Sequence, residues 1–433
     1  MIRLLCLADV HFGRTPSRQP DDGAPITIQS AWDTAIDYAI QARVDAVVIA
    51  GDLFDNRAGA LTAHHHIQQG FALLHQARIP VVLTAGNHDF DATPSLLEAL
   101  QAFDNLHFLG KGGLWTYYDL IRDQQPILRI YGWSFTSDKC KTSPIERFPS
   151  HIDTNLPTIA LCHGIRDQSV GDYAPLMSNA MRRLPVDAWV LGHIHAPDIH
   201  PQPQPPIFYT GSLQGLDPGE PNLHGGVLMT IDNGKAIRTE MCYFAPLAYI
   251  DSSVDLTGEE TLDDVLIRIR SQLTDQFNDL INQHSGLQKI IFRTTLVGTL
   301  SLQISIHALE AALNTFQPIV PSVHRVGYLD RVIWMLTPDL DVTKHLDGDD
   351  VIAFLARILA TLEGKIEATP EIKTIIDESI RRFTDVHRLS DYHQIDAHVD
   401  ERIRPTELQA REALEQAVRL NLLELLDQAP LSN

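Results

Sequence analysis

The sequence predicts an α/β protein in which two packed sheets are flanked by helices. Apolar runs alternate with helical stretches in the first part of the chain, and later apolar runs follow one another closely, as in hairpins. With 433 residues, the chain is long enough for two or three domains. Its hydrophobic content of 44% and charged content of 21% are those of an ordinary globular protein.

The early apolar runs have the spacing of strand–helix–strand units. The stretches at 31–43 and 61–78 are predicted helices, the first with Ser30 as its capping residue and the second with apolar residues at helical spacing. Strands joined by such helices form right-handed parallel units. Shorter gaps predict antiparallel hairpins for the runs at 114–120, 127–133, 225–232 and 236–244.

Five apolar runs end directly in carboxylate, amide or imidazole side chains. They read IRLLCLADVH, VDAVVIAGDLFD, VVLTAGNHD, PTIALCHG and DAWVLGHIH. In an open α/β sheet, sites form at the carboxyl ends of the strands, so these side chains are expected to line one cleft. A single ending of this kind is ordinarily a turn, but five in sequence order indicate a site. The candidate metal ligands are Asp9, His11, Asp52, Asn87, His163, His193 and His195.

These seven side chains offer oxygen and nitrogen donors and no sulfur. They are too many for one tetrahedral ion and suit two divalent ions that share a carboxylate. Such donors favour manganese or iron, with zinc as a further option. Two ions held close together stabilise the attacking and leaving oxygens of an in-line phosphoryl displacement and generate hydroxide from water. The four cysteines include no CxxC pair, which argues against a disulfide scaffold or a zinc knuckle.

The five endings resemble the pattern of the calcineurin-like metallophosphoesterases, D-x-H, G-D-x-x-D, G-N-H-D/E, a lone histidine after a strand, and G-H-x-H. In this chain the blocks are Asp9-Val10-His11, Gly51 to Asp55, Gly86 to Asp89, His163-Gly164 and Gly192 to His195. The strand IFYTGSLQG at 207–215 resembles the SbcD-type bacterial DNA repair exonucleases, and SLQGLDPGEPNLHGGVLMTID resembles their YhaO-like branch. The resemblance is strong over residues 1–245 and diffuse afterwards.

The resemblance implies a role for each residue. One ion would be held by Asp9, His11, Asp52 and His195, and the other by Asp52, Asn87, His163 and His193, so that Asp52 bridges them. His88 would contact no metal; it would protonate the leaving oxygen or stabilise charge on it, and Asp55 would orient its ring. Asp89 is expected to accept hydrogen bonds that fix the loop.

Three regions are expected along the chain: a metallophosphoesterase domain at 1–245, a small α/β capping domain at 250–340 and a helical region at 345–433. The cap is predicted as helix–strand–helix–strand, beginning with an amphipathic helix at 262–283. In SbcD-like proteins such a cap helps to position DNA. The last helix carries an apolar stripe of Leu414, Val418, Leu422 and Leu425. This stripe is expected either to pack on the chain's own cap domain or to dock on another chain.

The expected function is that of a metal-dependent DNA phosphodiesterase, an exonuclease with endonuclease activity as a further option, in an SbcCD-like DNA repair complex. Its partners would be DNA, an SbcC-type SMC-like ATPase and, as a further option, a second copy of the chain. A net charge of −21 disfavours general polyanion binding and favours the first alternative, a phosphoesterase acting on nucleotides or other small phosphates. The second alternative is a non-catalytic scaffold for the ATPase. A poor signal peptide and the lack of a membrane-spanning apolar run predict a cytoplasmic protein without membrane attachment.

Overall fold

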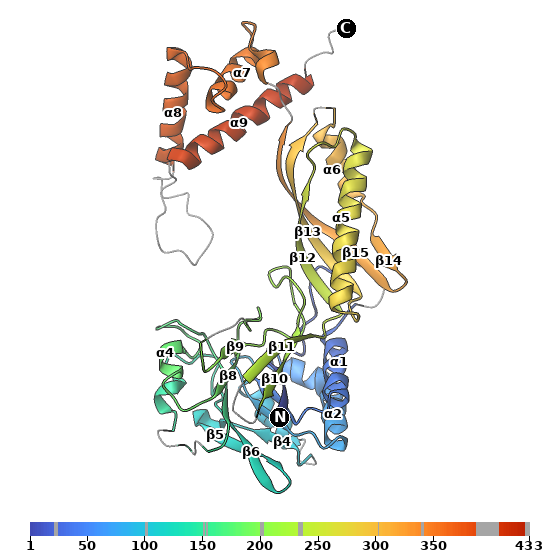
Figure 1. Ribbon diagram of the computed structural model, residues 1–433, viewed down its shortest axis with the longest axis vertical. Coiled ribbons are helices and arrows are strands. Elements are labelled where there is room, and N and C mark those ends of the chain that lie inside the picture. Colours follow the sequence, from blue (N-terminus) through green and yellow to red (C-terminus); the bar gives the residue numbers. More distant parts are fainter. Residues whose placement is uncertain are drawn as a thin grey trace. The chain divides into compact units, whose positions relative to one another are not determined.

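The computed structural model describes residues 1–20, 25–99, 103–149, 152, 155–199, 203–232, 237–301, 303–338, 342–386 and 407–428. The first part of the chain forms a sandwich of two sheets (Figure 1). One sheet has six strands in the order β11-β10-β1-β2-β3-β4, and the other has five in the order β5-β6-β7-β8-β9. This arrangement confirms the predicted pair of sheets flanked by helices.

The six-stranded sheet is parallel at its centre and ends in an antiparallel hairpin. Its parallel strands and the helices between them are β1 (Ile2–Leu7), α1 (Ile28–Gln41), β2 (Ala46–Ala50), α2 (Arg57–Gln76), β3 (Val81–Thr84), α3 (Ala92–Ala99) and β4 (Leu106–Phe108). The hairpin consists of β10 (Gly225–Ile231) and β11 (Ile237–Tyr243). The strand–helix–strand units and this hairpin were both predicted from the spacing of the apolar runs.

The five-stranded sheet has the second predicted hairpin at one edge. That hairpin is β5 (Thr116–Arg122) with β6 (Gln125–Gly132). The strands β7 (Thr158–His163), β8 (Ala188–Gly192) and β9 (Ile207–Tyr209) then continue in parallel. Three short helices lie in the connections: η1 (Lys111–Gly113), η2 (Pro144–Arg147) and α4 (Ser178–Met181).

Alternation along the strands gives the sandwich its layers. In β1, Leu5 and Leu7 pack against the helices α1 and α2, whereas Leu4 and Cys6 face the other sheet. The core between the sheets receives Ile159 and Leu161 from β7, and the next residues, Ala160 and Cys162, face the outer layer around Phe148 and Met181. The central parallel strands are therefore buried on both faces, which is why they are almost wholly apolar.

A second region contains a four-stranded sheet in the order β12-β13-β15-β14. Its elements are β12 (Leu247–Asp255), α5 (Leu262–Gln283), β13 (Lys289–Leu300), α6 (Ile306–Asn314), β14 (Ile319–Ser322) and β15 (Arg325–Pro338). The predicted helix–strand–helix–strand order is present within it. Strands β12 and β14 were not predicted from the sequence. Residues 250–255 of β12 alternate between buried and exposed, but the buried residue Ser252 is polar, so the alternation is weak in the sequence.

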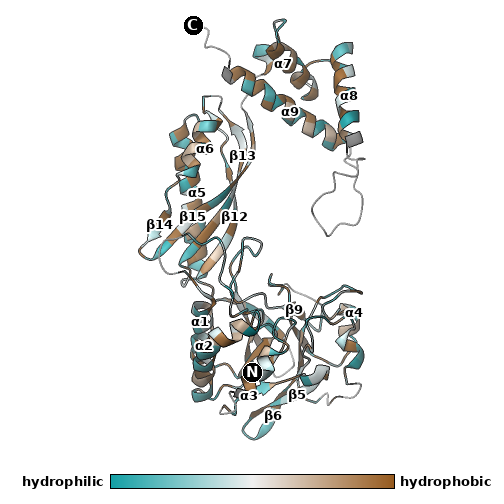
Figure 2. Ribbon diagram, turned by 180° about the vertical axis from the view of Figure 1, so that it is seen from behind, coloured by the Kyte–Doolittle hydropathy of each residue, from teal (hydrophilic) through white to brown (hydrophobic). Residues whose placement is uncertain are grey.

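The helical region comprises η3 (Val342–His345), α7 (Val351–Leu362), α8 (Pro370–Val386) and α9 (Glu407–Gln428). Polar and apolar residues mix along α9 (Figure 2). Val418 and Leu422 of α9 are buried in one cluster with Leu359 of α7 and Ile376 of α8. Leu414, Val418 and Leu422 of the predicted stripe therefore pack on neighbouring helices of the helical region. Thr406 and Gln409 have the sequence pattern of a capping box for this helix, but Thr406 lies outside the described residues.

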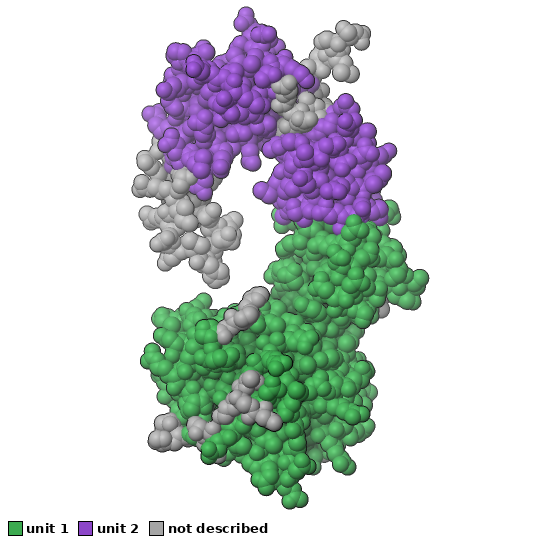
Figure 3. Space-filling model, viewed as in Figure 1, with its two compact units in different colours: residues 1–252, 273–294, 317–332 green, residues 253–272, 295–316, 333–433 purple. Residues whose placement is uncertain are grey.

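The chain divides into two compact units (Figure 3). One comprises Met1–Ser252, Leu273–Thr294 and Gln317–Val332, and the other comprises Ser253–Gln272, Thr295–Phe316 and Ile333–Asn433. The three domain ranges expected from the sequence stay predictions. Among the described residues, no helix combines the length and the apolar character needed to cross a membrane.

Candidate metal centre

The carboxyl ends of five parallel strands carry the predicted ligands. Asp9 follows β1, Asp52 follows β2 and Asn87 follows β3 in the first sheet, while His163 ends β7 and His193 follows β8 in the second. Strands of one direction end at the same edge of a sheet, so the loops of both sheets meet there. The structure brings all seven predicted ligands together at this edge, because His11 and His195 lie in the same loops as Asp9 and His193.

The backbone of the site is strained at the ligands. Asp9, His11, Asp52 and His193 have φ angles of 48°, 53°, 52° and 100°, in the left-handed region that side chains with a Cβ rarely adopt. Each such residue costs about 1–3 kcal/mol and persists only where the surrounding structure holds it. Neighbouring loops supply that hold, since Asp9 N donates to Gly51 O and His11 N donates to Asp52 O.

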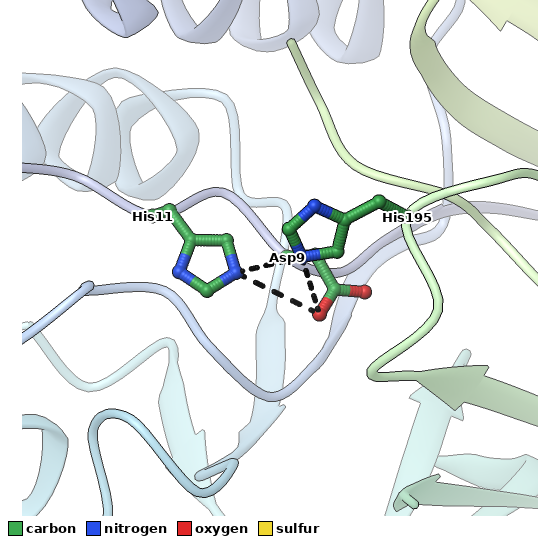
Figure 4. Close-up of side chains that lie close together, drawn as sticks. All are labelled: Asp9, His11 and His195. Carbon is green, nitrogen blue, oxygen red and sulfur yellow. Dashed lines mark hydrogen bonds and ion pairs between the residues drawn. The ribbon is translucent and has the colours of Figure 1, made fainter. Parts of the chain in front are cut away.

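Three residues form what we call the His195 group: Asp9, His11 and His195. His11 Nε2 lies 3.0 Å from His195 Nε2, and these two nitrogens lie 4.0 Å and 3.9 Å from Asp9 Oδ1. Figure 4 shows both rings turned toward the Asp9 carboxylate. One ligand atom from each residue lies within 4.8 Å of the others, as a shared metal ion requires.

Four residues form the His163 group: Asp52, Asn87, His163 and His193. Asn87 Oδ1 lies 3.1 Å from His163 Nε2 and 3.2 Å from His193 Nδ1. Asp52 Oδ2 lies 3.3 Å from His163 Nε2 and 3.7 Å from His11 Nε2. Asp52 thus stands between the two groups, which is the place that a bridging carboxylate needs.

The chemistry of these atoms fits a cation in each group. His163 Nδ1 donates to Ala50 O at 3.0 Å, so the proton of the neutral ring is on Nδ1 and Nε2 carries a lone pair. This lone pair faces the oxygens of Asn87 and Asp52. His195 Nδ1 lies 2.7 Å from a carboxylate oxygen of Glu220, so His195 Nε2 likewise carries the lone pair, which faces His11 and Asp9. Acceptors that converge in this way repel one another unless a proton or a metal ion lies between them.

The ionisation of the site follows from the same crowding. Burial raises the pKa of the Asp9 carboxyl, against the pull of His163 and His195. Burial also acts to raise the pKa of Asp52, but His163 and His11 outweigh it and hold that pKa well below its usual range. Burial would lower the pKa of His163, yet the Asp52 carboxylate raises it to about 9. A metal ion must therefore compete with a proton at His163, and metal binding is expected to strengthen as pH rises.

His88, predicted to act in catalysis, lies beside the ligands and is partly exposed. Its ring centre is 5.0 Å from that of His11, and 42% of its side chain is exposed. Its Nδ1 lies 3.0 Å from the main-chain oxygen of Asp55 and 3.6 Å from the Asp55 carboxylate. The shorter contact of His88 with Asp55 is thus to the main-chain oxygen. The Asp55 carboxylate lies at 3.6 Å from His11 Nδ1 as well, so it is shared between the two rings. A ligand atom of His88 also groups with His11 and Asp52.

Asp89 is fully buried and accepts three hydrogen bonds. Oδ1 accepts from Gly86 N at 2.7 Å, and Oδ2 accepts from Leu53 N at 2.9 Å and from the Thr93 hydroxyl at 2.6 Å. These bonds tie the turn that carries Asn87 and His88 to the loop that carries Asp52. The contacts match the role of loop-fixing acceptor expected from the sequence.

One residue of the site was missed. Glu220 contacts the His195 ring from a loop that follows β9, and no apolar run precedes it in the sequence. Strand-end reasoning could not find it, because its place depends on how the loop folds back. The only sequence signal was its position in the segment that resembles the YhaO-like branch.

Residues 2–197 match the family model described as calcineurin-like phosphoesterase. The uncharacterized metallophosphoesterase YhaO of Bacillus subtilis is 25% identical over 316 residues, which are 72% of this chain and 72% of that protein. The DNA double-strand break repair protein Mre11 of Haloferax volcanii is 25% identical over 281 residues, 62% of this chain and 58% of its own length. Its namesake from Methanosarcina mazei is 26% identical over 274 residues, 60% of this chain and 41% of its own. This chain thus spans less than two thirds of both archaeal proteins.

The family match covers all five strand-end blocks, from Asp9 to His195. The two-sheet sandwich places those blocks at one edge, and their donor atoms suit a pair of divalent ions. Residues 2–197 are therefore the calcineurin-like metallophosphoesterase domain of this chain.

Proposed function

We propose that the chain is a metal-dependent DNA phosphodiesterase, an exonuclease with endonuclease activity as a further option, and the nuclease subunit of an SbcCD-like repair complex. One observation carries this proposal. The similarity to archaeal proteins named for DNA double-strand break repair extends over 281 residues, which is longer than the phosphoesterase domain at 2–197. Similarity that continues beyond the catalytic domain supports a shared substrate class, and not only a shared chemistry.

The residues of the two groups have distinct tasks in this function. Asp9, His11, Asp52 and His195 would hold one divalent ion, and Asp52, Asn87, His163 and His193 the other, with manganese favoured over iron or zinc. The bound ions would supply a low-pKa water and positive charge at the phosphate. The fixed rings of His163 and His195 give a geometry that is ready before substrate arrives.

His88 is placed to handle a proton. Its Nδ1 is held by Asp55 O at a partly exposed position, and no hydrogen bond joins Nε2 to another of the described residues. In its protonated form, a ring held in this way can give a proton to a leaving oxygen. His88 is therefore the residue proposed to assist departure of the cleaved DNA end.

The net charge of −21 favours one alternative function, the hydrolysis of nucleotides or other small phosphates. Under the main proposal, an SbcC-type SMC-like ATPase of the cytoplasm supplies the basic surface that holds DNA. A second copy of the chain is a further option as a partner. Val418 and Leu422 of the α9 stripe are buried among α7 and α8, and Leu414 is partly buried in the same cluster. Docking of the ATPase would therefore use the outer surface of these helices. The second alternative, a non-catalytic scaffold, gives no reason for His88 beside a complete ligand set.

Purified protein, with and without manganese, should be offered linear double-stranded DNA, single-stranded DNA and a small phosphodiester such as bis(p-nitrophenyl) phosphate. Manganese-dependent shortening of DNA supports the proposal. Hydrolysis of the small ester without DNA cleavage supports the first alternative, and two bound ions without any hydrolysis support the scaffold. Asp52→Asn protein purified in parallel shows whether a contaminating nuclease is present.

A further inference from the structure

The loop at 210–224 encloses the far side of His195. Glu220 Oε1 lies 2.7 Å from His195 Nδ1, and only 14% of the Glu220 side chain is exposed. The same loop also grips the main chain of His195, because Ser212 N donates to His195 O at 2.9 Å. Ring and backbone of this candidate ligand are thus held by one segment.

The Glu220 carboxylate is itself fixed. Its second oxygen accepts from Leu216 N at 3.0 Å and from the Ser212 hydroxyl at 3.2 Å. Its main-chain oxygen lies 3.1 Å from His224 Nε2, and the other nitrogen of that buried ring lies 2.8 Å from the Ser212 hydroxyl. Both carboxylate oxygens and the backbone of Glu220 are therefore occupied, so the carboxylate cannot swing away from His195 without breaking several bonds.

The contact determines which nitrogen of His195 faces the metal group. A carboxylate accepts but cannot donate, so the proton of the neutral ring is on Nδ1 and the lone pair is on Nε2. Nε2 is the atom that lies 3.0 Å from His11 Nε2 and 3.9 Å from Asp9 Oδ1. A carboxylate behind a metal-binding imidazole fixes its tautomer and makes it a more basic ligand.

We propose that Glu220 is a positioning residue that makes His195 a ligand, and that it selectively strengthens the ion held by the His195 group. This inference rests on the calcineurin-like metal centre and not on the proposed DNA substrate. Its tests measure metal binding and ring protonation, so a failure to cleave DNA leaves it untouched.

In the first experiment, metal-free protein is titrated with Mn²⁺ and binding is measured by calorimetry. Elemental analysis after dialysis then counts the ions that stay bound. Glu220→Gln keeps the size of the side chain but removes its charge. It is expected to weaken one of the two ions by about 10–100-fold, the usual effect of losing such a partner, and to leave the other unchanged. Asp217→Asn is the matched control, because Asp217 lies in the same loop and its side chain accepts from Gly219 N rather than contacting His195.

Ser212→Ala separates positioning from loop structure. It removes a bond to the second oxygen of Glu220 while leaving the contact between Oε1 and His195 in place. The ion of the His195 group should weaken by less than in Glu220→Gln, and the other ion should bind as before. The proposal is overturned if Glu220→Gln binds both ions as the unmodified protein does, or if Ser212→Ala weakens the same ion equally.

A second measurement needs no stable Glu220 variant. Long-range proton–nitrogen NMR of the histidine rings, on metal-free protein at alkaline pH, reports which ring nitrogen carries the proton. The signal of His195 is identified by its absence in His195→Gln. A proton on Nδ1 supports the proposal, and a proton on Nε2 contradicts it.

Discussion

His163 and His195 are both candidate metal ligands, but a main-chain oxygen holds the first ring and a side chain holds the second. His163 is the last residue of β7, is fully buried, and donates to a main-chain oxygen of β2, Ala50 O, at 3.0 Å. His195 lies in the loop after β8 with 22% of its side chain exposed, and its partner is the side chain of Glu220. One ligand is positioned by the sheet itself and the other by a single carboxylate on a loop.

This difference implies that the two metal positions respond differently to mutation. A main-chain anchor cannot be removed by deleting a side chain, so the orientation of the His163 ring is disturbed only when the strands move or the anchoring bond is crowded. A side-chain anchor can be removed alone, so the His195 group can be weakened with the fold intact. Substitutions at shared residues should affect both positions, and substitutions at the anchors should affect one.

Asp52→Asn should have the largest effect, because it acts on both groups. Asp52 Oδ2 lies 3.3 Å from His163 Nε2 and 3.7 Å from His11 Nε2. Loss of its charge removes the bridging carboxylate, so both ions should be lost or one should remain weakly held, and hydrolysis should disappear. Elemental analysis of dialysed protein measures the bound metal.

Asp91→Asn is the control for that change, since Asp91 is near the same loops and its carboxylate forms a long ion pair with the exposed Arg57. It should keep two ions. If Asp52→Asn also keeps two tightly bound ions, Asp52 is not the bridge and the two groups are independent sites.

His88→Ala should keep both ions and lose catalysis. His88 is partly exposed, and its Nδ1 is directed to Asp55 O. Removing a general acid is expected to slow phosphodiester cleavage by about 10²–10⁴-fold. The rate on a small phosphodiester and the metal content should be measured on the same sample.

His65→Ala is a matched control, because His65 is an exposed residue of α2 that bonds Gln69 within the same helix. Its rate should equal that of the unmodified protein. Loss of an ion from His88→Ala would show that His88 is a ligand, which its grouping with His11 and Asp52 makes worth testing.

The comparison of the two histidines also explains what the sequence could predict. The ligands at strand ends were predictable because an apolar run followed by polar side chains fixes their place along the chain, and parallel strands bring such ends together. Glu220 was not predictable from residues alone, because it reaches His195 through a loop whose course depends on bonds to Leu216 N and Ser212. The same limit applies to α9. Helical spacing predicted its apolar face, but not that α7 and α8 cover it.

Gly192→Ala tests the main-chain anchor of His163. A Cβ at Gly192 would lie 2.2 Å from Ala50 O and 2.8 Å from His163 Nδ1, so it would crowd both atoms of the anchoring bond. Crowding of this kind typically costs about 1–3 kcal/mol of unfolding free energy. The ion of the His163 group should weaken while that of the His195 group remains, the reverse of the pattern expected for Glu220→Gln.

Urea unfolding of metal-free protein and Mn²⁺ titration measure the two effects. Gly171→Ala is the control, since the nearest atom to its added Cβ would be Gln168 Oε1 at 3.6 Å. If Gly192→Ala weakens both ions equally, the two groups share one support and the contrast between them is wrong.

Thr93→Val should have the smallest effect, and it tests whether a side-chain anchor must always be critical. Thr93 is fully buried and donates to Asp89 Oδ2 at 2.6 Å, but Asp89 keeps two main-chain donors, Gly86 N and Leu53 N. Valine preserves the shape and leaves no donor unpaired, so the expected cost is one net hydrogen bond, about 0.5–1.5 kcal/mol of unfolding free energy. Because the main-chain donors still fix the turn that carries Asn87, both ions should bind as before. Urea unfolding and Mn²⁺ titration check this against Thr62→Val, which removes an exposed hydroxyl from α2. Loss of the ion near Asn87 would show that metal binding by the His163 group also depends on the Thr93 side chain. The main-chain donors to Asp89 would then not be enough to hold the turn.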